Sequence, residues 1–360
     1  MNEKIDKFKL EDLGYSDFFK NSKASEIDAS FVPARIIAEH KELYILRNEV
    51  SEFSAKITGK MMFTASSRED YPAVGDWVLI TVLDDEKAVI HEILPRKTVL
   101  KRKSIAKMDA QIIAANIDLA FIIQALDRDY NLNRFERYFA LAQSGKIKPA
   151  IVLNKTDLID EEELASKISE IKERFNDIDI YATSTLTGQG LSVLKQDINR
   201  GLTYCFLGSS GVGKSSIINM LLGKELLKTG EISSHTSKGK HVTTHRELFV
   251  LDSGGVVIDN PGMREVGLVD SDTGIKNVFC EFDELSRSCR FIDCTHEHEP
   301  GCAVLDAVRS GEIDEQKYEN YMRLVRENEF NTMNKIEKRQ KDKKFGKFIK
   351  QAKKDIRKYK

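Results

Sequence analysis

The chain has 360 residues, of which 41% are hydrophobic and 31% charged. This composition is typical of globular proteins and is long enough for two or three domains, each with its own core. No run approaches the 18 or so uncharged apolar residues that a membrane span requires, and the start lacks an apolar leader with a cleavage site, so we expect a cytoplasmic protein with no membrane partner.

The charges are distributed unevenly along the chain. The formal net charge is −1, but residues 334–360 carry 13 Lys and Arg against three acidic residues, a local net charge of +10. Two interpretations of this tail have equal weight: a segment that binds a polyanion, and a solvated helical face.

The first hundred residues divide into a polar segment and a strand-rich segment. Residues 1–30 are weakly patterned, and we expect an appendage with no assigned role. Residues 34–102 contain short alternating apolar runs, which predict four or five antiparallel strands in an OB-type barrel, a fold that often binds nucleic acid. The only tryptophan, Trp77, stands in one of these runs, and we favour core packing over base stacking as its role.

From about residue 116 to residue 268, apolar strands alternate with amphipathic helices. This order predicts a mostly parallel sheet with helices on both faces. The expected strands are "IDLAFIIQAL", "KPAIVLN", "IDIYATS" and "TYCFLGS", the expected helices are "NRFERYFALAQS", "DEEELASKISEIKERF" and "KSSIINMLLG", and "RELFVLDSGGVVIDNPG" is typical of a hairpin.

A phosphate-binding loop follows the strand "TYCFL". It fits G-x-x-x-x-G-K-[ST] in every fixed position and opens a helix, so its backbone N–H groups and the helix N-terminus are expected to surround phosphate oxygens. Lys214 would reach the β- and γ-phosphates, and the Ser215 hydroxyl would ligate Mg²⁺. The loop consists of Gly208, Ser209, Ser210, Gly211, Val212, Gly213, Lys214 and Ser215.

A second pair of candidate catalytic residues lies farther on, in "VVIDNPG". Asp259 would hold Mg²⁺ through water, and the Gly262 N–H would meet the γ-phosphate. The polar stretch "SKGKHVTTHREL" before it is typical of a switch loop, and either Thr243 or Thr244 would complete the Mg²⁺ shell. Met263 stands where Ras-like enzymes place a glutamine that orients water, a task that a thioether cannot perform.

The pattern Asn154-Lys155-Thr156-Asp157 predicts a guanine site. The Asp157 carboxylate would accept hydrogen bonds from both guanine N1–H and the 2-amino group, which adenine does not offer in that arrangement. Asn154 would tie the site to the phosphate loop, and the Lys155 stem would lie over the base. Ser184 and Thr185, after another strand, stand where GTPases contact the guanine O6.

The guanine pattern precedes the phosphate loop, whereas GTPases normally have it after that loop. A circular permutation explains this order, because joining the old ends of a domain and opening it elsewhere leaves each strand end in place. We therefore predict an α/β P-loop GTPase domain that is circularly permuted.

A cysteine cluster follows this domain: Cys289, Cys294, His296 and Cys302. Three thiolates and an imidazole form a closed tetrahedral site of the structural zinc type. His298 competes with His296 as the fourth ligand, and three free cysteines are the alternative interpretation.

These motifs resemble the ribosome small-subunit-dependent GTPase A (RsgA) family of circularly permuted bacterial GTPases. The resemblance covers residues 32–330 and rests on "VGDWV", "NKTDL", "GSSGVGKSS", "SKGKHVTTH", "DNPGMRE" and "CRFIDCTHEHEPGCAV". It implies a phosphate loop from Gly208 to Ser216, zinc on the four cluster residues, and an OB barrel, a permuted GTPase domain and a small, mostly helical zinc domain. The expected divisions are an extension at 1–30, the barrel at 31–104, the GTPase domain at 105–270 and the zinc-binding part with its basic tail at 271–360.

The resemblance also implies a function. Such a protein binds GTP and GDP with Mg²⁺, acts as a monomer in late maturation of the 30S ribosomal subunit and contacts its 16S rRNA. We expect the subunit to stimulate hydrolysis by ordering the switch loop around Thr243, Thr244 and His241. Two rivals are a GTPase of translation or transport, and an rRNA-binding protein whose nucleotide site is a passive sensor.

Overall fold

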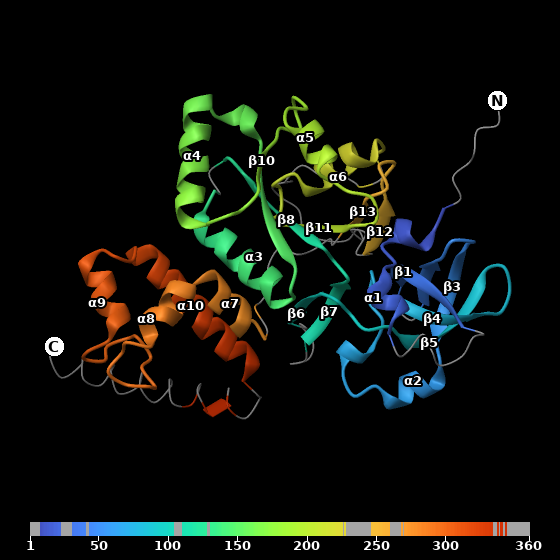
Figure 1. Cartoon of the computed structure of the whole chain (residues 1–360), viewed down its shortest axis with the longest axis horizontal. Helices are drawn as coiled ribbons and strands as arrows, with labels where there is room; N and C mark the ends of the chain where they lie inside the picture. The colour runs from blue at the N-terminus through green and yellow to red at the C-terminus, as the bar shows by residue number, and fades with distance from the viewer. Residues whose placement is uncertain are drawn as a thin grey trace. The chain divides into compact units, whose positions relative to one another are not determined.

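The computed structural model describes residues 8–22, 31–40, 43–103, 110–127, 130–225, 227, 246–259, 268, 270–333, 337, 339, 340 and 343 (Figure 1). The chain forms two compact units, one of residues 1–101 and 111–266 and the other of residues 102–110 and 267–360. In the part of the chain that the structure describes, no helix has the length and apolar character needed to cross a membrane.

Five strands near the N-terminus form a closed barrel, as expected. They lie in the order β1-β2-β3-β5-β4, and β1 closes the ring by pairing with β4. The expectation that all neighbours are antiparallel is wrong for β3 and β5, which run parallel. A ring of five strands cannot alternate in direction throughout, so one pair must be parallel. The elements are β1 (Val32–His40), β2 (Leu43–Arg47), β3 (Glu52–Ile57), α2 (Gly59–Thr64), η3 (Arg68–Asp70), β4 (Trp77–Val82) and β5 (Lys87–Ile93).

The segment before the barrel packs onto it. The 3-10 turn η1 (Leu10–Leu13) and the helix α1 (Asp17–Lys20) bury Leu13 and Phe19, and the Phe19 ring lies 5.9 Å from that of Trp77. Trp77 is fully buried, which confirms its core role. The expectation of an appendage is therefore wrong for residues 8–22. The segment is too short to show a helical period, and its few apolar residues carry the packing.

Arg35 of β1 joins three parts of the first unit. It is buried, and its guanidinium donates hydrogen bonds to the carbonyl oxygens of Leu13, Gly75 and Asn116 and to the hydroxyl of Thr203, the last at 2.9 Å. Burial lowers the pKa of Arg35 to about 10, so the side chain stays charged at neutral pH. One buried cation thus links the N-terminal segment, the barrel and the strand before the phosphate loop.

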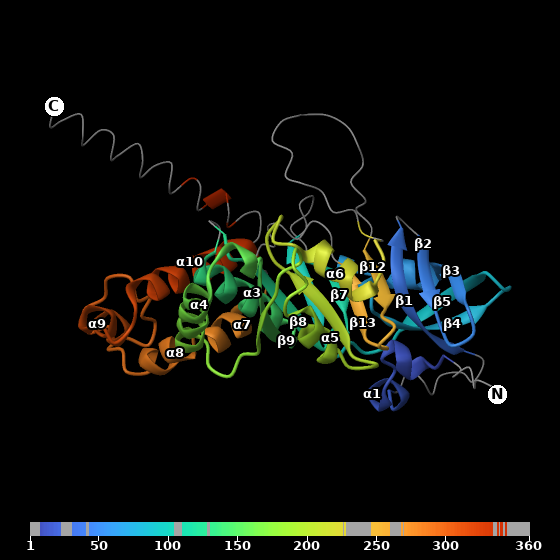
Figure 2. The ribbon, with the colours of Figure 1, turned by 90° about the horizontal axis from the view of Figure 1, so that it is seen from above.

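The barrel is continuous with the α/β sheet. The sheet has the order β10-β9-β8-β11-β13-β12, and a pairing of Ala38 in β1 with Glu247 in β12 connects the two parts (Figure 2). In this order, each strand from β10 through β13 runs parallel to the next one. The strands β12 and β13 form the expected antiparallel hairpin. The strands are β8 (Leu119–Ala125), β9 (Lys148–Asn154), β10 (Ile180–Ala182), β11 (Thr203–Leu207), β12 (Glu247–Val250) and β13 (Val256–Asp259).

Helices cover both faces of this sheet. Leu191 and Leu194 of α5 and Ile217 of α6 share one core with alternate residues of β8 and β11, while α3 packs on β8 and β9 and ends at Gly145 as expected. The helical elements are α3 (Leu132–Ser144), η4 (Thr156–Leu158), α4 (Glu161–Arg174), α5 (Leu191–Gln196) and α6 (Lys214–Leu222).

The second unit is mostly helical. Phe279 and Phe282 are buried, and the Phe282 ring stacks on Tyr321 with centroids 4.5 Å apart. The barrel, the α/β domain and this helical part confirm the predicted multidomain fold. The remaining elements are the paired strands β6 (Val99–Lys103) and β7 (Ala110–Ala115), and α7 (Asp272–Val278), α8 (Cys280–Ser286), α9 (Ala303–Ser310) and α10 (Glu315–Thr332).

Candidate functional site

The predicted guanine and phosphate segments meet at one edge of the sheet. β9 ends at Asn154, β11 ends just before Gly208, and both are parallel to β8, which lies between them. Ligands of open α/β sheets bind at this carboxyl edge. The Asn154 amide donates a hydrogen bond to the Val212 carbonyl oxygen at 2.8 Å, which confirms the predicted tie between the guanine pattern and the phosphate loop.

Two glycines of the phosphate loop have no room for a side chain. A Cβ on Gly213 would lie 2.2 Å from Nδ2 of Asn154, and the φ of Gly213 is +99°. A Cβ on Gly208 would lie 2.4 Å from the carbonyl oxygen of Ile123 in β8. The glycines therefore permit the close approach of three strand ends as well as the turn itself.

The guanine loop is held by contacts on each of its residues. Lys155 adopts a left-handed backbone (φ +63°), and its ammonium lies 3.0 Å from the Asp127 carboxylate. Thr156 is buried, and its N–H donates to the carbonyl oxygen of Thr183 at 3.2 Å. Asp157 accepts a hydrogen bond from the Ser184 hydroxyl. The two predicted base-reading segments are thus in direct contact.

Sequence reasoning missed two residues of this loop. Thr183 donates its hydroxyl hydrogen to Asn154 Oδ1 at 3.2 Å, and Asp127 pairs with Lys155. Thr183 directly precedes Ser184 and could have been found by extending that segment by one residue. Asp127 follows β8, and its only sequence signal is its place just after the end of a buried strand.

The phosphate loop leads into α6, whose Ile217, Ile218 and Leu221 face the core. The Lys214 ammonium donates to the carbonyl oxygens of Gly208 at 2.8 Å and Ser209 at 2.6 Å. Among the other predicted residues, Ser210 and Gly211 are exposed, Thr185, Ser215 and Ser216 are half-buried, and Asp259 is half-buried at the end of β13, the neighbour of β11. Thr243, Thr244, His241, Gly262 and Met263 lie outside the described residues.

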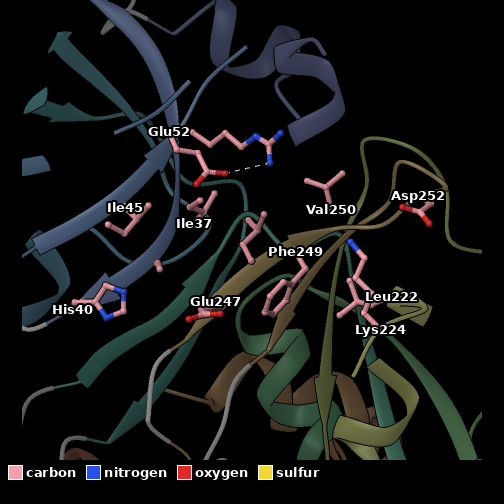
Figure 3. A pocket seen from close by; sticks show the side chains of 13 residues that line it. Ile37, His40, Ile45, Glu52, Leu222, Lys224, Glu247, Phe249, Val250 and Asp252 are labelled. Atoms are coloured by element: carbon pink, nitrogen blue, oxygen red, sulfur yellow. Dashed lines mark hydrogen bonds and ion pairs between the residues drawn. The ribbon is translucent and has the colours of Figure 1, made fainter. Parts of the chain in front are cut away.

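A separate cavity of about 410 Å³ lies where the barrel joins the sheet (Figure 3). Ile37, His40 and Ile45 line it from the barrel, and Phe249 and Leu222 line it from β12 and α6. None of the predicted nucleotide-site residues is among its lining residues. The cavity therefore lies at the β1–β12 junction and apart from the predicted nucleotide site.

The second unit brings the four predicted zinc ligands together. The ligand atoms of Cys289, Cys294, His296 and Cys302 all lie within 4.8 Å of one another. The Cys289 and Cys302 sulfurs are 3.9 Å apart, and His296 Nδ1 lies 3.3 Å from the Cys302 sulfur. Zn–S bonds of 2.3 Å in a tetrahedron give ligand separations of about 3.8 Å, so the four donors fit zinc. His298 is exposed and lies outside the cluster.

Neighbouring elements hold the ligand loop in shape. The Leu305 N–H at the start of α9 donates to the Cys302 sulfur at 3.5 Å. The Tyr318 hydroxyl of α10 donates to the His296 carbonyl oxygen at 2.6 Å, and Arg326 pairs with Glu297 at 2.7 Å. The cluster thus fastens α9 and α10 to the loop, as a structural metal site does.

Comparisons with known proteins agree with this geometry. A family model described as RsgA GTPase matches residues 93–269. A protein of Opitutus terrae named "Small ribosomal subunit biogenesis GTPase RsgA" is 39% identical over 332 residues, which are 89% of this chain and 90% of that protein. The chain belongs to the RsgA GTPase family. A Bacteroides thetaiotaomicron protein named "Small ribosomal subunit biogenesis GTPase RsgA 1" is 41% identical over 87% of this chain and 88% of its own length.

Two solved structures are similar in fold to this chain over most of its length. YjeQ from Thermotoga maritima is 28% identical, with a TM-score of 0.62 over 82% of this chain and 97% of that one. YloQ, described as a circularly permuted GTPase, has a TM-score of 0.60 over 85% of this chain and 98% of its own, at 24% identity. These two structures show the predicted permuted fold. Membership of the RsgA GTPase family shows that the chain is a GTP-hydrolysing enzyme. A model described as 50S ribosome-binding GTPase also matches residues 203–343.

Proposed function

We propose that this chain is a ribosome assembly GTPase that binds the 30S subunit in its late maturation and hydrolyses GTP faster on that subunit. The names and long matches of its RsgA relatives carry this proposal. The OB-type barrel and the tail of net charge +10 support it, because both suit a polyanionic partner such as 16S rRNA. We also infer that the protein acts in the cytoplasm as a monomer.

The proposed roles of the nucleotide-site residues follow from their positions. Asp157 selects guanine, with Ser184 orienting its carboxylate. Lys214 lies on the phosphate loop, where exchange of its two carbonyl contacts for phosphate oxygens would place its charge on the β- and γ-phosphates. Ser215 and Asp259 would hold Mg²⁺, which neutralises phosphate charge. The roles of Thr243, Thr244 and Gly262 at the γ-phosphate and Mg²⁺ are proposed from the sequence alone. The division of the chain into segments 1–30, 31–104, 105–270 and 271–360 is likewise a proposal.

The proposed cofactor of the second unit is one structural zinc ion. Its donor set of three thiolates and one imidazole leaves no open coordination position, so we assign it no part in hydrolysis. Its function would be to keep α9, α10 and the ligand loop as one rigid body that a ribosomal particle can contact.

The direct test is single-turnover GTP hydrolysis by the wild-type protein with and without purified 30S particles. We expect a clear rise in rate with 30S, and Lys214→Ala should abolish hydrolysis in both cases. Equal rates would contradict the stimulation and favour a passive sensor or a GTPase of another purpose.

A second candidate partner is the large subunit, because of the 50S ribosome-binding model match. Cosedimentation with 30S, 50S and 70S particles, in GDP and in a non-hydrolysable GTP analogue, separates the two. We expect binding to 30S alone. Binding to 50S alone would overturn the proposal and support the second candidate.

A further inference from the structure

The short helix α2 between β3 and β4 is formed by local hydrogen bonds and contributes nothing to the core. The Met61 N–H donates to the Thr58 hydroxyl at 3.2 Å, and the Thr64 hydroxyl donates to the Lys60 carbonyl oxygen at 3.0 Å. No residue of α2 is buried. Phe63 is 91% exposed and Met62 is 56% exposed. Large apolar side chains left together in water on a well-formed helix indicate a contact surface.

The barrel does not need α2 to cover its apolar interior. The N-terminal segment already packs on Trp77 through Phe19 and Tyr15, with ring centroids 5.9 and 4.7 Å from that of Trp77. In Figure 1, α1 lies beside the barrel strands and α2 at its outer margin. The exposed side chains of α2 are therefore available for another molecule.

The surroundings of α2 are positively charged. Lys56, Lys60 and Arg68 are exposed, and within the described part of the chain none of them takes part in an ion pair. Two carboxylates lie in the same stretch: Glu69 is 2.7 Å from the Lys101 ammonium, and Asp70, which stays charged, accepts hydrogen bonds from Ser66 and Ser67. The cations therefore outnumber the carboxylates. This excess of cations fits a polyanion.

We propose that α2 is an RNA-contact element, in which Phe63 and Met62 pack on unpaired bases while Lys56 and Lys60 meet the phosphates beside them. An aromatic side chain among cations is the usual way in which proteins hold single-stranded RNA without reading its sequence. A wholly apolar contact with a ribosomal protein would leave the three cations without a partner. The proposal rests on the proposed binding of a ribosomal particle and adds the surface that makes it.

The first experiment measures binding of the full-length protein to 30S particles and, separately, to a fluorescein-labelled single-stranded RNA of twelve nucleotides. Phe63→Ala should weaken both by roughly 5- to 150-fold, the range for loss of one base stack. Val50→Ala is the matched control, because Val50 is 82% exposed in the turn between β2 and β3. It should leave binding unchanged. The melting temperature and the basal GTP hydrolysis of both variants should equal those of the wild type.

A separate variant tests how much the positive charge beside α2 contributes to RNA binding. Lys60→Ala should weaken RNA binding at low salt and lower the slope of log affinity against log salt by about 1. An unchanged slope together with unchanged Phe63→Ala affinity would overturn the proposal.

The second experiment identifies the molecule that α2 touches. Phe63 is replaced by p-benzoylphenylalanine, the full-length protein is bound to purified 30S particles, and the complex is irradiated. An adduct with rRNA supports the proposal, and an adduct with a ribosomal protein alone overturns it. Wild-type protein that fails to bind 30S contradicts the proposed function, and the oligonucleotide then decides the inference by itself.

Discussion

At the scale of single residues, one side chain joins the predicted guanine segment to the phosphate loop. Asn154 holds the phosphate loop through the Val212 carbonyl and is itself held by the Thr183 hydroxyl. The carboxylate of Asp157, which we propose reads the base, follows three residues later and accepts a hydrogen bond from Ser184. The neighbouring residues Thr183 and Ser184 therefore hold Asn154 and Asp157, and Asn154 links the two predicted segments.

Asp157→Asn should lower the affinity for GTP about 100-fold or more, because an amide cannot accept both hydrogens of guanine and two charge-assisted hydrogen bonds are lost. Xanthosine triphosphate, which offers a carbonyl in place of the amino group, should bind the variant better than GTP does. Fluorescence titration with labelled nucleotides checks both.

The control for this variant is Asp177→Asn, an exposed position whose φ of +52° suits asparagine. It should bind GTP as the wild type does. Retention of full GTP affinity by Asp157→Asn would show that another residue reads the base.

The residues of this site were largely predictable, and their supports were not. Asn154, Asp157 and Lys214 belong to patterns whose chemistry fixes both residue type and spacing. Arg35 belongs to no pattern, since its partners come from four distant places in the chain and are mostly backbone carbonyls. Contacts to backbone leave no trace in the partner's residue type, which is why the sequence could not show this junction.

At the scale of elements, the N-terminal segment and the barrel form one structure. The segment buries Leu13 and supplies Tyr15 and Phe19 to the packing around Trp77. Its Asp12 forms an ion pair of 2.6 Å with Arg200 of the α/β domain. The barrel strands themselves were predictable from their alternation. The parallel β3–β5 pair was not, because it follows from closure of the ring, which no local pattern reports.

Phe19→Ala should destabilise the first unit by about 3 kcal/mol, the usual cost of removing a buried phenylalanine. Phe18→Ala is the matched control, because its neighbour Phe18 is 47% exposed and should cost less than about 1 kcal/mol. Urea denaturation followed by Trp77 fluorescence measures both. Equal, small effects would show that the segment does not stabilise the barrel.

The Asp12–Arg200 pair should make stability depend on pH. The Arg200 hydrogen bond lowers the pKa of Asp12 in the folded protein. The stabilisation is therefore complete above the unfolded pKa of about 3.9 and is lost as the pH falls through the lower folded value. Arg200 is largely exposed, so the gain should be about 1 kcal/mol or less.

Asp12→Asn tests this dependence by urea denaturation at several pH values. The variant should be less stable than the wild type at pH 6 to 7, and the difference should shrink below about pH 4. Asp17→Asn, at an exposed carboxylate on α1, should show no such difference. If the difference in stability between Asp12→Asn and the wild type stays constant with pH, the ion pair is not its cause.

At the scale of the whole molecule, the nucleotide site and the candidate metal site lie in different units. All described residues of the nucleotide site belong to the first unit, and the four cluster residues belong to the second. The cysteine spacing predicted the cluster because a closed metal site constrains residue types, and the choice of His296 over His298 needed the folded loop.

Removal of the metal should therefore affect only the second unit. We expect one zinc ion per chain by elemental analysis of the wild type and of Cys280→Ser, whose cysteine lies outside the cluster. Cys302→Ser should lose the metal and become sensitive to proteolysis after about residue 267, while GTP affinity stays the same. Full zinc content in Cys302→Ser would disprove the assigned ligand set.

The strand order also sets the sequence of events during synthesis. The guanine loop is carried by the strands β8, β9 and β10, and these leave the ribosome before β11 and its phosphate loop. In the finished sheet, β11 then takes its place between β8 and β13. A nascent chain therefore holds its predicted base-reading half before any phosphate site exists, and we expect GTP to assist folding only after the phosphate loop, residues 208–215, has emerged. More than half of the enzyme must therefore be made before it can bind its substrate.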